Sequence, residues 1–375
     1  VFTAPADVLH TSDNNPLKLV LGPNSLFGLD EDEHLRARRI VLPPFHGERM
    51  GTYADVFEEE TLAEMKSWPM DRDFKTTGPM MRITLNSILR TVFGAQGEDL
   101  EILRKGLPRW VRHGAMITVS PLLRMNLGPM SPWGRHLAHR REYDAVVQRL
   151  IDTCRRDPKL AERTDVLALL VQARYEDGSE MTLEEIADQL LTILTAGHET
   201  TAGSLAWAIE RLRRHPQLLA ELTEEAHAGG NELRLATVTE VQRIRPVILG
   251  AFRCVMKPFE LGEWLLPPGS AVTVDTKALH NNPQLFPDPE RFSPKRFVGE
   301  KPSTYAWVPF GGGRRRCVGA AFAQLEMDVV LKTILTRCDL VPTSEPDEKP
   351  LYRGISVVPR KGGLARVRAF DFWSG

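Results

Sequence analysis

The strongest hydrophobic pattern of the 375-residue chain lies between residues 182 and 213. Thr182 and Glu185 have the spacing of a capping box, so we expect a helix to begin there. At 1.5 Å per residue this helix would be about 45 Å long. Its length and apolar content predict a helix that crosses a domain interior. Its apolar side chains recur every three or four residues, as on one helix face, at Leu183, Ile186, Leu190, Ile193, Leu194 and Leu205.

Weaker patterns predict the remaining elements. A second helix is expected over 233–245, because Pro246 disfavours helix at the residue before it. Short β-prone runs surround the Pro-Pro-Gly turn at 267–269. Residues 281–297 are rich in proline and aspartate, which predicts irregular coil, and a last helix should begin near Cys317. We therefore predict a mainly α fold with a small β portion, as one domain over residues 1–375.

Composition narrows the class of protein. Apolar residues make up 42 % of the chain and charged residues 26 %, which is typical of a globular enzyme. A formal charge of −1 gives no reason to expect nucleic acid as a partner. The four cysteines form no CxxC pair, which fits a reducing cytoplasm, and no apolar run has the length of a membrane span. Because the chain begins at Val1 without a methionine, we expect an upstream segment, so an upstream anchor is not excluded.

One cysteine stands in an unusual setting, the stretch FGGGRRRCVG over residues 310–319. Three glycines allow a tight backbone in front of Cys317, and three arginines place positive charge near it. The expected start of the last helix adds the partial positive charge of unpaired N–H groups. Each feature favours a thiolate. From the residues alone, Cys317 could be a nucleophile, a metal or haem ligand, or a packed residue.

The fixed positions of this stretch match the pattern FxxGxRxCxG. The stretch resembles the haem-binding signature of the cytochromes P-450, and the resemblance, of bacterial type, runs from Val1 to about Val358. It implies the cytochrome P-450 fold, with a long distal helix over heme b (iron protoporphyrin IX) and the thiolate of Cys317 as the axial iron ligand. Further cofactor contacts implied by the resemblance are Phe310, Gly311, Arg315 and Gly319.

The long helix carries a second match, AGHETT at 196–201, which resembles the family pattern (A/G)Gx(D/E)TT. The resemblance implies that Ala196 and Gly197 bring the helix backbone close to the cofactor, and that Glu199 and Thr200 deliver protons to O₂. The Thr200 hydroxyl is expected to bond a carbonyl one turn back. Taken alone, the stretch would be an ordinary helix Thr beside a solvent-facing Glu. It also begins like the zinc motif HExxH, which fails because position 202 is Ala.

Two further matches concern charged residues. Glu240 and Arg243 are three apart on one helix face, and with Arg291 of "PERF" they resemble the family's Glu-Arg-Arg set. That set is expected to hold the coil before the cysteine loop. His34 and Arg38 resemble the family's HxxxR, and with Arg253 and Arg315 they are expected to bind the haem propionates. Outside this frame each would be an ordinary surface charge.

Together these matches imply a haem-dependent monooxygenase that inserts one oxygen atom of O₂ into a C–H bond of a lipophilic small molecule, such as a fatty acid, terpene or steroid. Electrons would come from NAD(P)H through a ferredoxin or flavodoxin with its reductase, because the chain has no Walker loop, no GxGxxG after a strand and no CxxC set. A peroxygenase or haem-thiolate isomerase and a non-catalytic haem-binding sensor remain alternatives. Besides 17–27, the expected substrate pocket includes Thr192, Ile193, Val247, Ile248, Leu249 and Ile355.

Overall fold

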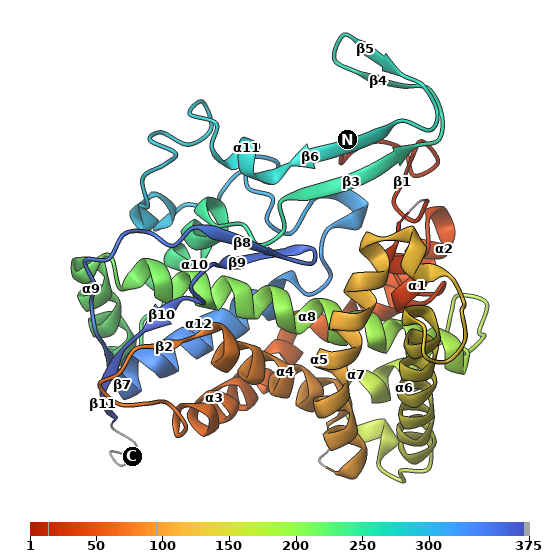
Figure 1. The fold of residues 1–375 in the computed structure, drawn as a ribbon, viewed down its shortest axis with the longest axis horizontal. Helices are drawn as coiled ribbons and strands as arrows, with labels where there is room; N and C mark the ends of the chain where they lie inside the picture. Colours follow the sequence, from red (N-terminus) through yellow and green to blue (C-terminus); the bar gives the residue numbers. More distant parts are fainter. Residues whose placement is uncertain (14, 95–96, 371–375) are drawn as a thin grey trace. The chain divides into compact units, whose positions relative to one another are not determined.

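The computed structural model describes residues 1–13, 15–94 and 97–370. Helices dominate it (Figure 1), as the sequence predicts. In the described part of the chain, no helix combines the length and the apolar character needed to cross a membrane. The helices are α1 (Leu17–Leu21), α2 (Glu31–Val41), α3 (Gly51–Met65), α4 (Thr77–Phe93), α5 (Glu98–Val119), α6 (Pro132–Arg155), α7 (Val166–Gln172), α8 (Leu183–Leu212), α9 (Pro216–His227), α10 (Glu232–Ile244), α11 (Thr276–His280) and α12 (Ala320–Arg337).

The β portion is small and antiparallel. One sheet has three strands in the order β1–β3–β6, and the other strands pair as β2 with β10, β4 with β5, β7 with β11 and β8 with β9. The predicted mainly α fold with a small β portion is therefore confirmed. The strands are β1 (Leu9–His10), β2 (Phe74–Lys75), β3 (Gly250–Val255), β4 (Phe259–Leu261), β5 (Trp264–Leu266), β6 (Ala271–Asp275), β7 (Cys338–Leu340), β8 (Pro350–Arg353), β9 (Ser356–Pro359), β10 (Leu364–Ala365) and β11 (Val367–Phe370).

The chain forms two compact units, and each contains segments from distant parts of the sequence. Unit 1 comprises Val1–Arg49, Ile88–Ala196 and Phe252–Thr273. Unit 2 comprises Met50–Ser87, Gly197–Ala251 and Val274–Gly375. The boundary falls inside α8, so both units contain part of this helix. The predicted single domain is not tested by this division and stays a prediction.

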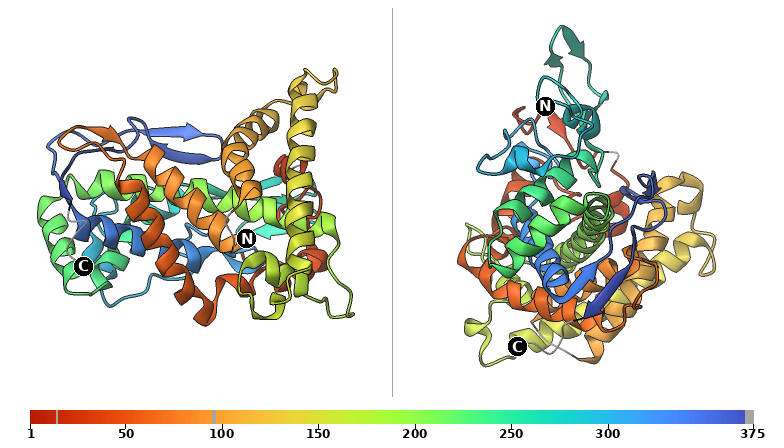
Figure 2. Two further views of the ribbon diagram at one scale, coloured as in Figure 1. Left: turned by 90° about the horizontal axis from the view of Figure 1, so that it is seen from below. Right: turned by 90° about the vertical axis from the view of Figure 1, so that its left-hand side faces the viewer.

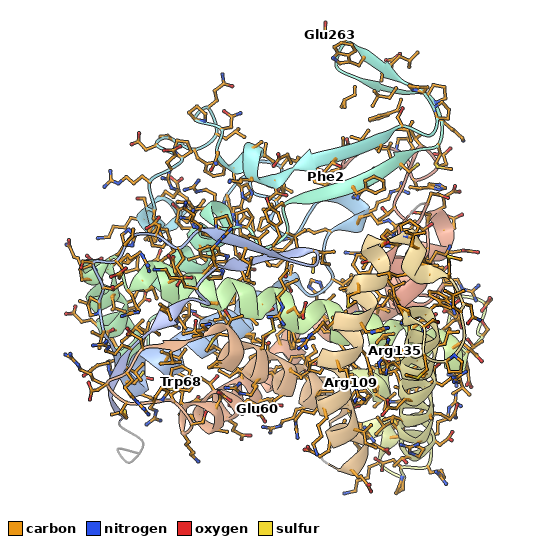
Figure 3. The ribbon with its side chains drawn as sticks, viewed as in Figure 1. Phe2, Glu60, Trp68, Arg109, Arg135 and Glu263 are labelled. Atoms are coloured by element: carbon orange, nitrogen blue, oxygen red, sulfur yellow. The ribbon has the colours of Figure 1, made fainter. Side chains whose placement is uncertain are left out.

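Unit 1 contains the packed pair α5 and α6 and most of the three-stranded sheet. Buried Leu9, Val255 and Val272 form a small apolar cluster on that sheet. The β4–β5 hairpin extends from the sheet, with Glu263 at its tip (Figure 3). Leu9 pairs with Val255 across β1 and β3, which fixes the register of the first strand. The sheet therefore ties the first residues of the chain to a segment some 250 positions later.

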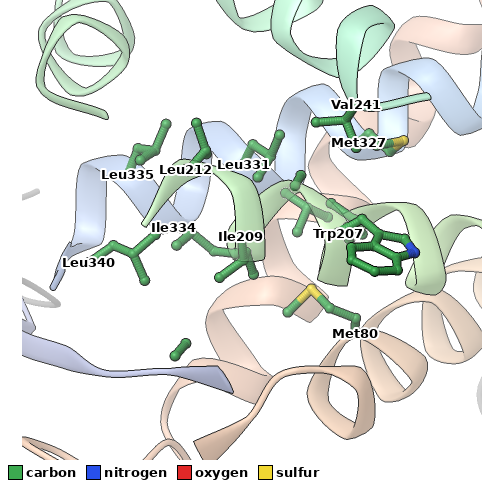
Figure 4. Close-up of a cluster of buried hydrophobic side chains, with 14 of the residues drawn as sticks. Met80, Trp207, Ile209, Leu212, Val241, Met327, Leu331, Ile334, Leu335 and Leu340 are labelled. Atoms are coloured by element: carbon green, nitrogen blue, oxygen red, sulfur yellow. The ribbon is translucent and has the colours of Figure 1, made fainter. Parts of the chain in front are cut away.

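Unit 2 contains a large cluster of buried hydrophobic side chains (Figure 4), to which the second half of α8 and α12 both contribute. Trp207 and Ile209 of α8 are fully buried in the same cluster as Ile334 of α12 and Met80 of α4. Burying side chains of this size stabilises a fold by about 1.5–3 kcal/mol each. The cluster packs α4, α8 and α12 against one another.

The predicted capping box at the start of α8 is confirmed. The backbone N–H of Thr182 donates to the Glu185 carboxylate at 2.7 Å, and the N–H of Glu185 donates to the Thr182 hydroxyl at 3.2 Å. Two of the four N–H donors that a helix start leaves without an intrahelical partner are thereby satisfied. The helix extends to Leu212, one residue short of the predicted end.

The start of α12 differs from the prediction. This helix begins at Ala320, three residues after Cys317, and not near Cys317 itself. The N–H of Cys317 donates to the carbonyl of Phe310 at 2.9 Å, and residues 313–315 form a short 3-10 turn. Because this N–H is committed to the loop, Cys317 belongs to the loop and not to the first turn of the helix.

Candidate functional site

The loop around Cys317 folds back on itself through backbone hydrogen bonds. Besides the bond between Cys317 and Phe310, the N–H of Gly311 donates to the carbonyl of Val308 at 3.0 Å. Gly311 and Gly313 have φ angles of +67° and +60°, a left-handed conformation that favours glycine. The glycines of FGGGRRRCVG therefore allow the tight turn that precedes the cysteine.

Cys317 differs from the other cysteines in exposure. None of the four cysteines forms a disulfide within the described residues, but Cys154, Cys254 and Cys338 are buried and Cys317 is exposed. Burial raises the pKa of the Cys338 thiol to about 12 and also raises that of Cys154, which makes both poor metal ligands. Of the four, Cys317 is therefore the thiol that a ligand can reach.

An aromatic cluster packs against the loop and connects it to α10. The rings of Phe310 and Trp307 meet edge to face, with centroids 5.9 Å apart. The indole N–H of Trp307 donates to the carbonyl of Thr239 in α10 at 3.1 Å. Phe310 packs against a buried cluster that contains Phe286 and Trp307. The loop thus has an apolar support on one side and a hydrogen bond to a core helix.

Glu240 and Arg243 of α10 form a fully buried ion pair. The Arg243 guanidinium donates to both Glu240 oxygens, at 2.7 and 2.8 Å, and a third N–H donates to the carbonyl of His280 at 2.9 Å. Glu240 also accepts the backbone N–H of Ser293 at 2.8 Å. These bonds anchor the predicted coil over 281–297 to α10. The coil is irregular as expected, apart from a short 3-10 turn over Pro294–Phe297.

The third arginine of this set is not the predicted one. The side chain of Arg291 is exposed, and its carbonyl accepts from Arg243 at 3.3 Å. The guanidinium of Arg296 lies 3.4 Å from the Glu240 carboxylate instead and also donates to the carbonyl of Pro287. We therefore place Arg296 beside Glu240. The sequence holds the signal, because "PKRF" repeats the Pro-x-Arg-Phe spacing of "PERF" five residues later.

His280 joins this network to the cysteine loop. Its Nε2 accepts the N–H of Val308 at 2.9 Å, so the ring proton is on Nδ1, which donates to the carbonyl of Arg243 at 3.0 Å. Burial lowers the pKa of His280 to about 4, so the ring is neutral near pH 7. A neutral histidine thus links α10 to the chain nine residues before Cys317. The sequence reasoning missed this residue.

The middle of α8 is less buried than the turns on either side of it. Ala196 is exposed, and Gly197, Glu199 and Thr200 are half-buried, whereas the flanking turns are buried. In this stretch the Thr201 hydroxyl donates to the carbonyl of Gly197 at 3.1 Å. Ala196 and Gly197 carry no bulky side chain, and their close approach to a flat cofactor stays a prediction. The bond expected for Thr200 and the proton-delivery role stay predictions.

Three of the predicted propionate contacts lie in unit 1. His34 is buried and Arg38 half-buried on α2, one turn apart. Arg253 of β3 is buried, and its guanidinium donates to the carbonyl of Phe252 at 2.7 Å. Burial lowers the pKa of Arg253, and among the described residues no carboxylate lies within ion-pair distance of it. A buried guanidinium with no carboxylate beside it in the described residues is suited to binding an anionic ligand. Arg315 is half-buried in unit 2.

The predicted pocket residues are distributed over both units. Thr192 and Ile193 of α8 are buried in unit 1. In unit 2, Val247 is buried and its carbonyl accepts the N–H of Val357 in β9 at 2.9 Å. Ile248 and Leu249 are half-buried, and Ile355 is exposed at the β8–β9 turn. Their role as one substrate pocket stays a prediction.

A further buried acid was missed by the sequence reasoning. Glu326 of α12 has 0 % exposed surface, and neither carboxyl oxygen meets a hydrogen-bond donor among the described residues. Burial raises the pKa of Glu326 well above its usual value, and the nearby Ser87 hydroxyl offsets this only in part. Phe322, Glu326 and Val330 are spaced four apart, so the apolar stripe of α12 was the available signal.

Comparisons with known proteins show the family to which the chain belongs. The family model for cytochrome P450 matches residues 20–366. A Mycobacterium tuberculosis protein named cytochrome P450 138 is 48 % identical over 98 % of this chain and 83 % of its own length, and cytochrome P450 135B1 of that organism is 42 % identical over 98 % of this chain and 80 % of its own.

Solved structures show the same fold. Retinoic acid-bound cyanobacterial CYP120A1 has a TM-score of 0.86 at 22 % identity, covering 98 % of this chain and 86 % of that one. A cytochrome P450 named CYP102L1 has a TM-score of 0.83 at 24 % identity, covering 97 % and 89 %. The chain belongs to the cytochrome P450 family. It is a monooxygenase that uses heme b, O₂ and electrons from a redox partner on a small-molecule substrate.

Proposed function

We propose that Cys317 is the axial ligand of heme b and that the enzyme hydroxylates a lipophilic small molecule, such as a fatty acid, terpene or steroid. The exposed thiol of Cys317, in a loop fixed by its own backbone bonds, is the observation that carries the proposal. Bound haem with a thiolate ligand supplies O₂ activation. His34, Arg38, Arg253 and Arg315 are the cations that would hold its propionates.

The chain's own residues would supply protons and exclude water. Glu199 is half-buried on α8, where a carboxylate can exchange a proton with solvent, and the Thr200 hydroxyl one residue later can pass it inward. Phe310 and its aromatic support would shield the sulfur from water. Apolar Val247, Ile248 and Leu249 support a lipophilic substrate. The family match over residues 20–366 supports a single catalytic domain, and four cysteines without a disulfide in the described structure support a cytoplasmic location.

We propose a ferredoxin or flavodoxin, with its reductase, as the electron donor. Arg314 and Arg316 are exposed on either side of half-buried Arg315, directly before Cys317. These cations favour an acidic partner, and screening should weaken docking as salt rises. An Arg314→Gln/Arg316→Gln variant should lower the rate of reduction and flatten its salt dependence. Arg353→Gln/Arg360→Gln, which removes two exposed cations elsewhere, is the matched control. An unchanged salt dependence in the first variant would contradict this docking site.

The substrate class is tested by titrating the ferric enzyme with a panel of fatty acids, terpenes, steroids and polar sugars while the haem absorption band is recorded. Lipophilic compounds should shift the band and then support NADPH consumption with a ferredoxin and its reductase. A shift with the sugars alone would overturn the substrate proposal. Turnover with peroxide but not with any reductase would instead identify a peroxygenase.

A further inference from the structure

The β8–β9 hairpin of unit 2 has one buried strand and one exposed strand. All four residues of β9 are buried, whereas all four of β8 are exposed. Figure 2 shows the blue hairpin beside the green second half of α8. A buried strand needs partners for the backbone groups on both of its edges, because an unpaired N–H or C=O away from water destabilises the fold. Within the described residues the two strands form a sheet of their own, so β8 supplies partners on one edge of β9 only.

Two residues outside the hairpin complete the other edge of β9 at Val357. The N–H of Val357 donates to the carbonyl of Val247 at 2.9 Å. The carbonyl of Val357 accepts the indole N–H of Trp207 in α8 at 3.1 Å. Both backbone groups of Val357 are therefore bonded to partners outside the hairpin, one in α8 and one in the segment that follows α10.

The indole of Trp207 also contacts the segment after α10 directly. The Arg245 guanidinium lies over the indole ring, 5.3 Å from its centroid, which is a cation–π contact. Trp207 itself is fully buried in the cluster shown in Figure 4. A side chain of this size, packed on all sides, has little freedom to change its position. It therefore fixes both residues 245–247 and β9 with respect to α8.

The junction of these three segments is tightly packed. Gly203 lies one helical turn before Trp207 in α8. A β-carbon at Gly203 would lie 3.3 Å from a side-chain carbon of Val358 and 3.4 Å from one of Val247. Such distances are shorter than the optimal separation of two carbon atoms. Glycine is unfavourable inside a helix, so its presence here fits the close approach of both segments to α8.

We propose that Trp207 is a positioning residue that determines which lipophilic substrates the enzyme accepts and which carbon it hydroxylates. The inference rests on the proposed function, because the two segments that Trp207 fixes carry the pocket residues expected in unit 2. Trp207 acts through the backbone of Val357 and through Arg245, and it needs no contact with the substrate. The expected pocket residues on the two segments are Val247, Ile248, Leu249 and Ile355.

The test compares Trp207→Phe, which keeps an aromatic ring but removes the N–H donor, with Trp68→Phe. Trp68 is a buried indole of the same cluster, and its N–H has no acceptor among the described residues, so it is the matched control. Each purified holoenzyme is titrated with lauric acid, limonene and testosterone while the haem absorption band is recorded. Turnover products are then analysed with a ferredoxin and its reductase as electron donor.

Trp207→Phe should change the ratio of the dissociation constants of two of these compounds by about tenfold and should hydroxylate a different set of carbons. Trp68→Phe should keep the ratios and products of the parent, even where it lowers the unfolding temperature. The reduced carbon monoxide spectra of both variants should stay unchanged. A purely structural role of Trp207 would lower stability without changing the affinity ratios or the products.

A second variant leaves the indole in place. Gly203→Ala should move the same two segments away from α8 and should change the same affinity ratios. Gly51→Ala in α3 is its control, because the added methyl group would meet no atom within 4 Å. If Trp207→Phe yields no folded holoenzyme, the comparison of Gly203→Ala with Gly51→Ala decides the question.

Amide hydrogen exchange on the same holoenzymes needs no substrate and separates this inference from the proposed function. Trp207→Phe should speed exchange in residues 247–251 and 350–359 by about tenfold, and Trp68→Phe should not. Unchanged exchange and unchanged affinity ratios in Trp207→Phe and Gly203→Ala would overturn the inference, as would an equal change in Trp68→Phe. A parent that binds none of the three compounds, together with the expected exchange result, would overturn the proposed substrate class and support the positioning role of Trp207.

Discussion

Two glutamates of unit 2, Glu240 on α10 and Glu326 on α12, are equally buried, with 0 % exposed surface, but differ in their partners. Glu240 accepts two hydrogen bonds from Arg243 and one from the backbone of Ser293. Glu326 has no donor at hydrogen-bonding geometry among the described residues. Burial alone therefore does not give an acid a role. Its partners decide whether it holds the fold as an anion or is buried in its neutral form.

The largest loss of stability is expected when Glu240 is replaced. Glu240→Ala leaves the Arg243 guanidinium buried without its counter-charge, which should cost about 3–5 kcal/mol of unfolding free energy. Urea unfolding followed by circular dichroism measures this loss. Glu290→Ala, an exposed glutamate of the same coil, is the control and should change little. Equal stability of the two variants would show that the buried pair does not hold the coil.

A second large effect is expected on the pH dependence of stability, and it arises from His280. Its folded pKa of about 4 lies below the value of about 6.5 for an unfolded histidine. Between these values the unfolded chain binds more protons, so stability should fall by about 3 kcal/mol as pH drops from 6.5 to 4. Unfolding curves at several pH values measure the slope. His280→Gln should have a flatter slope in this window, and an unchanged slope would assign the effect to other groups.

A moderate effect separates the two arginines. Arg296→Ala removes a guanidinium 3.4 Å from Glu240 and a hydrogen bond to Pro287, so we expect a loss of about 2 kcal/mol. Arg291→Ala keeps the backbone carbonyl that Arg243 uses and should change stability by less than about 0.5 kcal/mol. Thermal unfolding of both variants checks the order. A larger loss for Arg291→Ala would restore the assignment made from the sequence.

The smallest effect is expected at Glu326, where a substitution should raise stability and not lower it. Because the pKa of Glu326 is raised in the folded state, its contribution to stability is present at low pH and is lost as pH rises above the usual glutamate value. Glu326→Gln removes this penalty, so the variant should equal or exceed the parent in stability at pH 7, by up to about 1 kcal/mol. The difference should grow from pH 5 to 8. A destabilised Gln variant would show that the carboxyl has a partner that its burial conceals.

The sequence predicted the elements whose signals are local. The capping box and the apolar spacing of α8 gave its start and its extent, because both depend on residues a few positions apart. The start of α12 was wrong by three residues, since the hydrogen bond from Cys317 to Phe310 is a property of the folded loop. Periodicity does not reveal which N–H a turn will use.

The candidate-site residues that lie at a fixed sequence spacing were predictable, and the other residues were less so. Glu240 and Arg243 were found because a helix brings residues three apart together. Arg296 was missed because two stretches, "PERF" and "PKRF", have the same spacing, and only the path of the coil decides which guanidinium reaches Glu240. His280 and Glu326 were missed because their roles depend on burial between helices distant in sequence.

The central claim is that Cys317, held in its loop by the Glu240 network, is the thiolate ligand of the haem. The most direct measurement is the absorption spectrum of the reduced, carbon monoxide-bound protein for the parent, for Cys317→Ala and for a variant with the three buried cysteines changed to alanine. The parent and the triple variant should show the strongly red-shifted band of thiolate-bound haem, and Cys317→Ala should lack it. Retention of that band in Cys317→Ala would contradict the account.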